Sequence, residues 1–268
     1  MGNFQKDYEI NGLVKAPFVL PGFLIDKMLE SLEKLLSDNP NIPPESLICP
    51  HISYGATHNA RSAAKWLDYA SNPDILDLVE QLIGPNIVLW GSQVFCKPPQ
   101  HGKGVPWHQD GHYWPIKPLA TCSVWIALDP ANSLNGCMQY IPGSHISKKL
   151  VPHTTSLDKQ VVLGEKIAMD GIDEAKAADN SLAKGEFSLH DVYLIHGSLP
   201  NKSKKRRAGF VIRYMPSNSL FSRVPGLKNQ RGVTFDMSNR PIWLLRGKDE
   251  SQNNNFEVGH KQNYILSA

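Results

Sequence analysis

The chain has 268 residues, of which 41% are hydrophobic and 20% are charged, and its formal net charge is +3. This is the composition of an ordinary soluble protein with one sizeable core. The charge is too small to indicate a nucleic acid or a membrane as partner. No apolar stretch approaches the roughly 20 residues that cross a bilayer.

The four cysteines, Cys49, Cys96, Cys122 and Cys137, show no CxxC spacing, so neither a disulfide framework nor a zinc–thiolate site is expected. The first ten residues resemble neither a signal peptide nor a transit peptide, and the last three are not a peroxisomal SKL signal. We therefore expect a cytoplasmic protein. Its oligomeric state cannot be read from the sequence.

Two helices are predicted before residue 85. Residues 24–37 place apolar side chains at helical spacing. Asn72 followed by Pro73 is typical of a helix start, and Gly84 ends the apolar stripe that follows. Residues 8–20 instead alternate loosely and predict one or two strands.

After residue 85 the sequence consists of short β-rich runs separated by Pro and Gly turns. The runs are Ile87–Trp90, Val94–Phe95, Ser123–Leu128, Met138–Ile141, Val192–Ile195 and Phe210–Tyr214. Such spacing predicts a mainly β fold with flanking helices, as a barrel or double-sheet jelly roll. We expect one domain over residues 1–268, with a helical buttress at about 20–85, a jelly-roll core at about 86–216 and C-terminal loops at 217–268. Residues 155–183 are expected to form an insertion and a candidate lid.

His108 and Asp110 are candidate metal ligands. They lie two residues apart, and alternate residues of a strand point to the same face. Two imidazoles and one carboxylate on one face of a metal suit non-haem Fe(II) and oxygen chemistry. The pair therefore requires a second, distant histidine.

The downstream candidates for that histidine are His145, His153, His190 and His196. His145 lies in a Pro-Gly-Ser-His turn, and His153 and His190 lack supporting neighbours. His196 ends an apolar run and precedes Gly197, where backbone can approach a ligand closely. We predict His108, Asp110 and His196 as the metal ligands and the catalytic centre.

Arg207 is the candidate anchor for an acidic cosubstrate. It shares a strand face with Val211 and Arg213, whereas Arg206 is expected to face solvent. The strands that carry His196 and Arg207 are expected to be neighbours. Arg207 would then bind the far carboxylate of a metal-bound 2-oxo acid, because arginine pairs with carboxylates through two hydrogen bonds.

Candidate substrate contacts follow from the same neighbourhoods. His112 shares the predicted strand face of His108 and Asp110, so it is a rival ligand, a substrate contact or a structural histidine. Tyr113 and Arg213 are the other candidates, as a pocket wall and as a partner for an anionic group.

At this point the sequence resembles the phytanoyl-CoA dioxygenase family of Fe(II)/2-oxoglutarate-dependent oxygenases. The motifs that carry the resemblance lie in order over about residues 90–215. They are Lys97-Pro98-Pro99, Trp107-His108-Gln109-Asp110, Trp125, Asn135-Gly136-Cys137, Ile141-Pro142-Gly143-Ser144-His145, His196-Gly197-Ser198, Asn201-Lys202-Ser203 and Arg207.

The resemblance implies a double-stranded β-helix that uses Fe(II), 2-oxoglutarate and O2 and releases succinate and CO2. Carried over by position, His108, Asp110 and His196 match the iron ligands. The positions that match the cosubstrate site are Arg207, Ser198, Gln93, Gln109 and Trp125. Related halogenases lack the carboxylate ligand, so the presence of Asp110 favours hydroxylation.

The family acts on many small molecules, and the substrate is the less defined part of the prediction. Residues 188–193 and 213–216 resemble bacterial members that hydroxylate small phosphonates such as 2-aminoethylphosphonate. The leading expectation is therefore a small organophosphonate. The alternatives are an amino acid, an acyl group or a natural product as substrate, or a cupin-like metal-binding protein without oxygenase activity. Arg207 argues against the last, since such a protein needs no anchor for 2-oxoglutarate.

Overall fold

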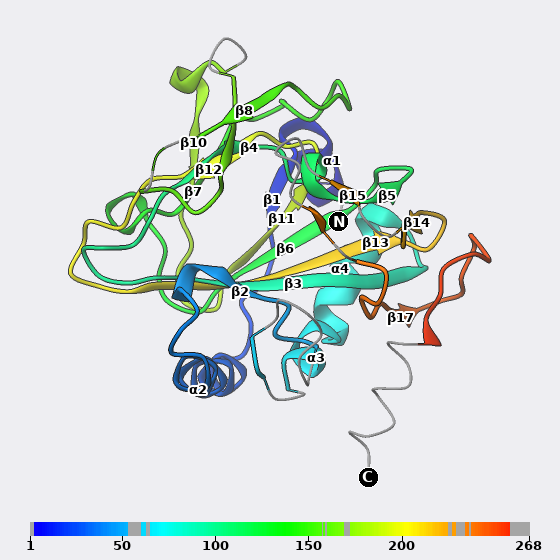
Figure 1. Ribbon diagram of the computed structural model, residues 1–268, viewed down its shortest axis with the longest axis horizontal. Helices are drawn as coiled ribbons and strands as arrows, with labels where there is room; N and C mark the ends of the chain where they lie inside the picture. Colours follow the sequence, from blue (N-terminus) through cyan, green and yellow to red (C-terminus); the bar gives the residue numbers. More distant parts are fainter. Residues whose placement is uncertain are drawn as a thin grey trace.

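The protein is described by a computed structural model that covers residues 3–52, 60–62, 65–156, 158, 160–168, 172–224, 227–228, 234–235 and 237–257. Two β-sheets face each other, and the helices cover the outer face of the larger sheet (Figure 1). Within these residues, no helix combines the length and the apolar character that crossing a membrane requires.

The N-terminal third supplies the helices α1 (Phe4–Asn11), α2 (Gly22–Asp38), α3 (Lys65–Ala70) and α4 (Pro73–Ile83), with a short 3-10 turn η1 (Pro44–Ser46). The predicted helices correspond to α2 and α4, and Asn72 caps α4 by accepting a hydrogen bond from the Ile75 amide. Residues 8–11 belong to α1 rather than to a strand. Tyr8 is buried, and Gly12 ends α1 with a φ of 75°.

The larger sheet has the strand order β1-β11-β6-β13-β3-β17, with β2 also paired to β3. Its strands are β1 (Leu13–Lys15), β2 (Leu47–Ile48), β3 (Ile87–Lys97), β6 (Cys122–Ala127), β11 (Phe187–Asp191), β13 (Arg207–Pro216) and β17 (Trp243–Arg246). One face packs on the helices through fully buried residues such as Met28, Leu32 and Ile212. The other face is turned toward the smaller sheet and contributes to the site.

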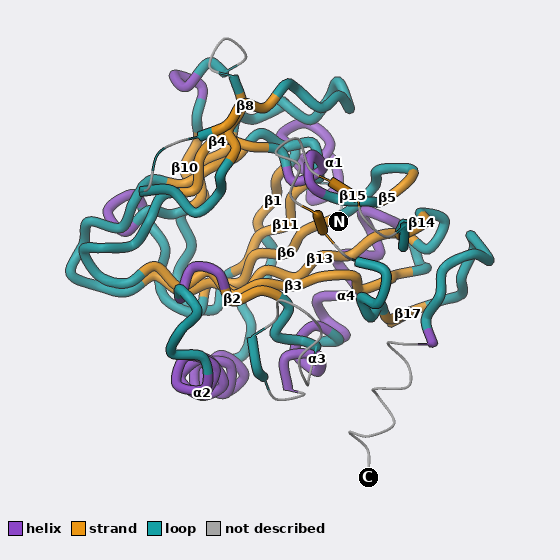
Figure 2. Tube along the Cα trace, in the orientation of Figure 1, coloured by secondary structure: helices purple, strands orange, loops and turns teal. Residues whose placement is uncertain are grey.

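The smaller sheet has the order β10-β7-β12-β4. Its strands are β4 (Val105–His108), β7 (Met138–Tyr140), β10 (Ala178–Asn180) and β12 (His196–Ser198). β12 runs antiparallel to β4, with His196 opposite His108. The two sheets form a double-stranded β-helix, and the predicted jelly roll with flanking helices is confirmed (Figure 2).

Two details of the strand prediction are wrong. Val192–Ile195 is not a strand, because β11 ends at Asp191, β12 begins at His196 and the residues between them cross from one sheet to the other. An apolar run without alternation does not distinguish a strand from a buried connection. The strands that carry His196 and Arg207 were also expected to be neighbours. They are not, because β12 and β13 lie in opposite sheets.

The segment predicted as an insertion folds partly against the smaller sheet. β8 (His153–Thr155) pairs with β9 (Glu165–Ile167), and a 3-10 turn, η5 (Glu174–Lys176), precedes β10. Backbone hydrogen bonds join Gly104 to Gln160 and Val162, which fixes this segment beside β4. The remaining elements are η2 (Asp110–Tyr113), η3 (Ser133–Asn135), β5 (Ile116–Lys117), β14 (Leu220–Phe221), β15 (Leu227–Lys228) and β16 (Thr234–Phe235).

Candidate active site

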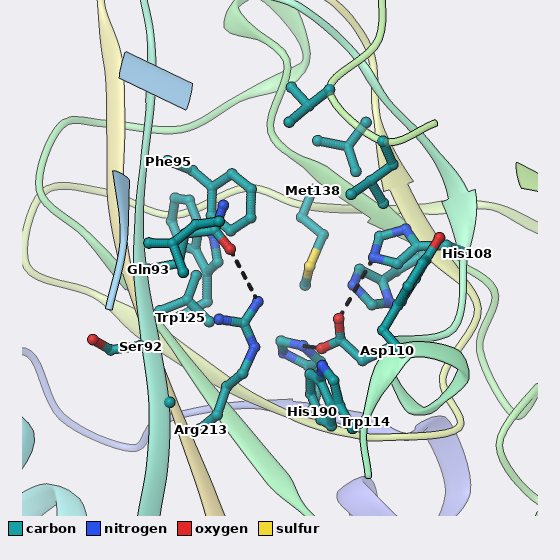
Figure 3. Close-up of a pocket in the computed structure, with 18 of the residues that line it drawn as sticks. Ser92, Gln93, Phe95, His108, Asp110, Trp114, Trp125, Met138, His190 and Arg213 are labelled. Carbon is teal, nitrogen blue, oxygen red and sulfur yellow. Dashed lines mark hydrogen bonds and ion pairs between the residues drawn. The ribbon is translucent and has the colours of Figure 1, made fainter. Parts of the chain in front are cut away.

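A cavity of about 500 Å³ lies between the two sheets. The smaller sheet and its connections contribute His108, Asp110 and His196 to its wall. The larger sheet contributes Gln93, Trp125, His190, Arg207, Val211 and Arg213. Figure 3 shows His108, Asp110 and His190 gathered on one side of this space, facing Gln93, Phe95 and Trp125.

Each of the two predicted histidine ligands is fixed by its own backbone. The Nδ1 atom of His108 lies 2.9 Å from the carbonyl oxygen of Pro106, and Nδ1 of His196 lies 2.9 Å from that of Leu194. A carbonyl only accepts hydrogen bonds, so each Nδ1 carries the proton and each Nε2 keeps its lone pair. Burial and the neighbouring His108 lower the pKa of His196 to about 3, although Asp110 acts in the opposite direction. Its ring is thus neutral, as a metal ligand must be.

Asp110 lies near the two histidines because of a turn and not, as predicted, because it continues a strand. β4 ends at His108, and Asp110 begins the 3-10 turn η2 rather than continuing the strand. Its Oδ1 nevertheless lies 3.6 Å from His108 Nε2. Ligand atoms of His108, Asp110 and His196 all lie within 4.8 Å of one another, and all three residues are buried. The structure therefore brings the predicted triad together.

His190 is a neighbour of Asp110 that the sequence reasoning set aside. Its Nε2 lies 3.6 Å from Asp110 Oδ2, the oxygen that also accepts a hydrogen bond of 3.4 Å from Ser123. Burial raises the pKa of Asp110, but its contacts with His108 and His190 and the nearby Arg213 and His196 hold that pKa well below its usual value. The carboxylate is therefore ionised. The position of His190 on β11, opposite Ser123, is a tertiary feature that no local motif signals.

The opposite end of the cavity is cationic. Arg207 is buried and donates from Nε and Nη2 to the Gly136 carbonyl, at 3.2 and 2.6 Å. Its guanidinium lies 5.4 Å from the Trp125 ring centroid. Burial lowers the pKa of Arg207 to about 10, so it remains charged at neutral pH. Arg207 and Trp125 thus lie together at the cavity wall, as the sequence predicted for a carboxylate anchor.

Lys97 lies beside Arg207 and was not among the predicted site residues. It is 1% exposed and donates from Nζ to Ser198 Oγ at 2.7 Å and to the Leu199 carbonyl. Burial and the charge of Arg207 lower its pKa to about 6. Ser198, predicted to lie beside the cosubstrate, lines the cavity with its hydroxyl held by this lysine. The signal that could have identified Lys97 is its cross-strand position opposite Arg207.

A second cationic group borders the cavity near Gln93. Arg213 donates to Gln93 Oε1 at 3.5 Å and lies over the Trp114 ring at 5.4 Å. Arg240, which the sequence reasoning missed, also lines the cavity and donates to Cys49 Sγ at 2.8 Å. Burial lowers the pKa of Arg213, Asp110 raises it, and the charge of Arg240 lowers it again. Within the described ranges, neither arginine forms an ion pair with a carboxylate.

Two predicted site residues do not line the cavity. The side-chain amide of Gln109 donates to the carbonyls of Lys149 and Tyr193 and accepts from the Val151 backbone amide, so it holds residues 149–151 and Tyr193 beside its own segment. His112 turns away because η2 replaces the expected strand. It stacks on His153 at 3.9 Å.

The third predicted substrate contact, Tyr113, does line the cavity. Two other arginines, Arg61 and Arg223, are not among the residues that line the cavity, and Arg223 donates to the carbonyls of Ser238, Arg240 and Asn255. Arg206 does not point freely into solvent but pairs with Asp129 and Glu33.

The residues present fit a divalent transition metal. Two imidazoles whose Nδ1 atoms face backbone carbonyls can present their Nε2 atoms to a metal, and an ionised carboxylate lies beside them in a buried setting. Nitrogen and oxygen donors in this combination, on one side of the ion, are the set that non-haem Fe(II) oxygenases use. The backbone carbonyls that hold the two rings provide the outer support such ligands require.

Comparisons with known proteins agree with this chemistry. Residues 8–209 match the family described as phytanoyl-CoA dioxygenase (PhyH). The peroxisomal phytanoyl-CoA dioxygenase of Homo sapiens is 25% identical over 280 residues, which cover 91% of this chain and 80% of that protein. A probable alpha-ketoglutarate-dependent hypophosphite dioxygenase of Stutzerimonas stutzeri is 34% identical over 152 residues, 54% of this chain and 51% of that one. The solved structure of the non-heme monooxygenase ThoJ in its apo form has a TM-score of 0.72 and 25% identity, covering 98% and 94%.

Proposed function

The chain belongs to the phytanoyl-CoA dioxygenase family of Fe(II)/2-oxoglutarate-dependent oxygenases, and we propose that it hydroxylates a small polar substrate in the cavity between its sheets. It is an enzyme that uses Fe(II), 2-oxoglutarate and O2. The observation that carries the assignment of the site is the convergence of His108, Asp110 and His196 within 4.8 Å.

In this proposal the three buried ligands hold the iron. Bound iron and 2-oxoglutarate supply the activation of O2, with release of succinate and CO2. The chain's own contribution is orientation: the carbonyls of Pro106 and Leu194 fix the two imidazole rings. Ser123 and His190 fix the carboxylate of Asp110 from its other oxygen.

Arg207 would receive the distal carboxylate of 2-oxoglutarate. Its Nη1 carries donors beyond the two groups that bind the Gly136 carbonyl, so one edge of the guanidinium can still pair with a carboxylate. Ser198 lies at the same end, held by Lys97, and the Trp125 ring covers the guanidinium. Gln93 also lines the cavity.

Asp110→Ala tests the assignment of the site. We expect the variant to lose Fe(II)-dependent conversion of 2-oxoglutarate to succinate by at least about a hundredfold, because even groups that only support metal ligands have effects of about 10- to 100-fold. Binding of Fe(II) is measured in parallel by metal analysis. Asp179→Ala, a change of an exposed aspartate on β10, is the control. Full activity and metal content in Asp110→Ala would refute the assignment.

The substrate proposed is a small anion, with an organophosphonate such as 2-aminoethylphosphonate as the leading candidate. The support is the pair Arg213 and Arg240, which line the cavity and form no ion pair within the described part of the chain. Buried guanidiniums are stabilised by the oxygens of phosphonate or carboxylate groups. Trp90, Tyr113 and Trp114 supply an apolar wall beside them. The S. stutzeri relative is named for a small phosphorus oxyanion, which favours the same chemistry.

A screen that measures succinate release tests the substrate class. It includes 2-aminoethylphosphonate, simple alkylphosphonates, amino acids and acyl-CoA esters. We expect phosphonates to stimulate succinate release most, and Arg213→Met to raise their KM by about tenfold or more while the substrate-independent rate persists. Arg61→Met, at an exposed position outside the cavity, is the matched control. Preferential turnover of an amino acid, acyl or natural-product substrate would replace the phosphonate proposal.

A further inference from the structure

Glu165 is a buried carboxylate at the cavity for which iron and cosubstrate binding provide no role. It lies on β9, lines the cavity and is 3% exposed. The nearest basic group is His112, whose Nε2 lies 3.3 Å from Oε2. That contact lacks hydrogen-bond geometry, and Oε2 has no hydrogen-bond partner among the residues that the structure describes.

A carboxylate oxygen buried without a donor lowers the stability of the fold. Such groups in a native protein therefore call for a reason, and one reason is a donor that arrives with a ligand. Glu165 is also held in place: it lies opposite Thr155 in the β8–β9 pair. Backbone bonds between Gly104 and Gln160 fix the chain just before it. The carboxylate group of Glu165 is thus a fixed feature of the cavity wall.

The remaining charges of the cavity indicate what the donor is. The acidic and basic side chains other than histidine along its wall are Asp110, Glu165, Arg207, Arg213 and Arg240. The proposed function assigns Asp110 to iron and Arg207 to 2-oxoglutarate. Two guanidiniums and one carboxylate are left for the substrate. They complement a molecule with a doubly negative group and one positive group.

We propose that Glu165 binds the ammonium group of a zwitterionic substrate whose anionic group pairs with Arg213 and Arg240. This inference rests on the proposed function, since it divides the same cavity between cosubstrate and substrate. It makes Glu165 a specificity-determining residue. The enzyme then selects amino-substituted acids over the same acids without the amine.

The test compares matched ligands by calorimetry with protein that carries Fe(II) and 2-oxoglutarate under anaerobic conditions. The pairs are 2-aminoethylphosphonate with ethylphosphonate, and 3-aminopropionate with propionate. We expect the wild-type protein to bind the amino member of at least the phosphonate pair about tenfold or more tightly. Glu165→Gln, which keeps the shape of the side chain, is expected to abolish the preference and leave ethylphosphonate binding unchanged.

Glu45→Gln is the matched control, because Glu45 is also a buried glutamate but lies outside the cavity wall. It is expected to keep the preference for the amine. Equal binding of amino and unsubstituted acids by the wild-type protein, or a preference that survives in Glu165→Gln, overturns the inference. The wild-type comparison remains decisive if the variant fails to fold. Failure of the proposed function is distinct, because the protein would then not bind 2-oxoglutarate or form succinate at all.

Discussion

At the scale of single residues, the Arg207 end of the cavity is unusual because it contains two buried basic side chains without an ion-pair partner among the described residues. Lys97 and Arg207 lie opposite each other on β3 and β13, and burial together with the charge of Arg207 lowers the pKa of Lys97 to about 6. The lysine is therefore largely neutral at neutral pH, and its amine donates to the Leu199 carbonyl and the Ser198 hydroxyl. A carboxylate bound at this end would favour the protonated lysine, so we expect Lys97 to strengthen the binding of 2-oxoglutarate.

Lys97→Met isolates the contribution of the lysine. The change removes the buried amine that donates to Ser198, while the methionine side chain fills a similar volume. We expect the Kd of 2-oxoglutarate to rise by about tenfold, with Fe(II) binding unchanged, because the metal ligands lie elsewhere. Calorimetry with and without metal provides the measurement. Lys103→Met, at an exposed position on the same connection, serves as control, and equal Kd values in Lys97→Met and wild type would contradict the prediction.

At the scale of elements, the contact between β13 and β6 depends on one glycine. A Cβ built at Gly209 would lie 2.2 Å from Cζ2 of Trp125, the ring that covers Arg207. Both strands are central in the larger sheet, so neither can retreat easily. Gly209 therefore permits the indole to lie flat against β13 and sets its distance from the anchor arginine.

Gly209→Ala should accordingly destabilise the protein by about 1–3 kcal/mol, the usual cost of overpacking a core. Urea unfolding of the metal-free protein measures the change. Gly91→Ala is the matched control, because a Cβ there meets only the Arg213 side chain at 3.7 Å, an ordinary contact. A loss of stability equal in the two variants would show that the tryptophan contact is not responsible.

The elements also show which features the sequence could predict. The cap at Asn72 and the alternation in β13 are local signals, so α4 and the cavity-facing set of Arg207, Val211 and Arg213 followed from them. Asp110 reached the triad although the strand expected there ends at His108, because the 3-10 turn brings the carboxylate to the same side. The turn carries no local signature, and it is what removed His112 from the cavity.

Residues whose roles depend on the opposite sheet were not predictable in the same way. His190 gains its role only because β11 pairs with β6 and places it near Asp110. Arg240 and Glu165 enter the cavity from segments that are far apart in the sequence. No spacing rule links them, since their proximity arises when the two sheets close on each other.

At the scale of the whole molecule, buried neutral histidines couple the fold to pH. His51 is 1% exposed, its Nδ1 lies 2.6 Å from Ser92 Oγ, and its ring lies edge-to-face with Trp243 at 5.1 Å. Burial and the charges of Arg240 and Arg213 lower its pKa from 6.5 to about 3. Between these values the unfolded chain binds a proton at this position and the folded protein does not. Stability is therefore intact above pH 6.5 and is lost as the pH falls toward 3.

The prediction concerns the slope of the free energy of unfolding against pH. Each such histidine lowers the free energy of unfolding by up to about 1.4 kcal/mol for every pH unit below 6.5. In the metal-free protein, His51→Gln should reduce the slope between pH 6 and 4 by about that amount, because glutamine does not titrate yet can still contact Ser92. Urea unfolding at a series of pH values measures it. His101→Gln removes an exposed histidine, whose access to water is similar in both states, and should leave the slope unchanged. If His51→Gln and wild type lose stability in parallel, the acid sensitivity of the fold must come from other groups, such as the carboxylates that are paired in the native state.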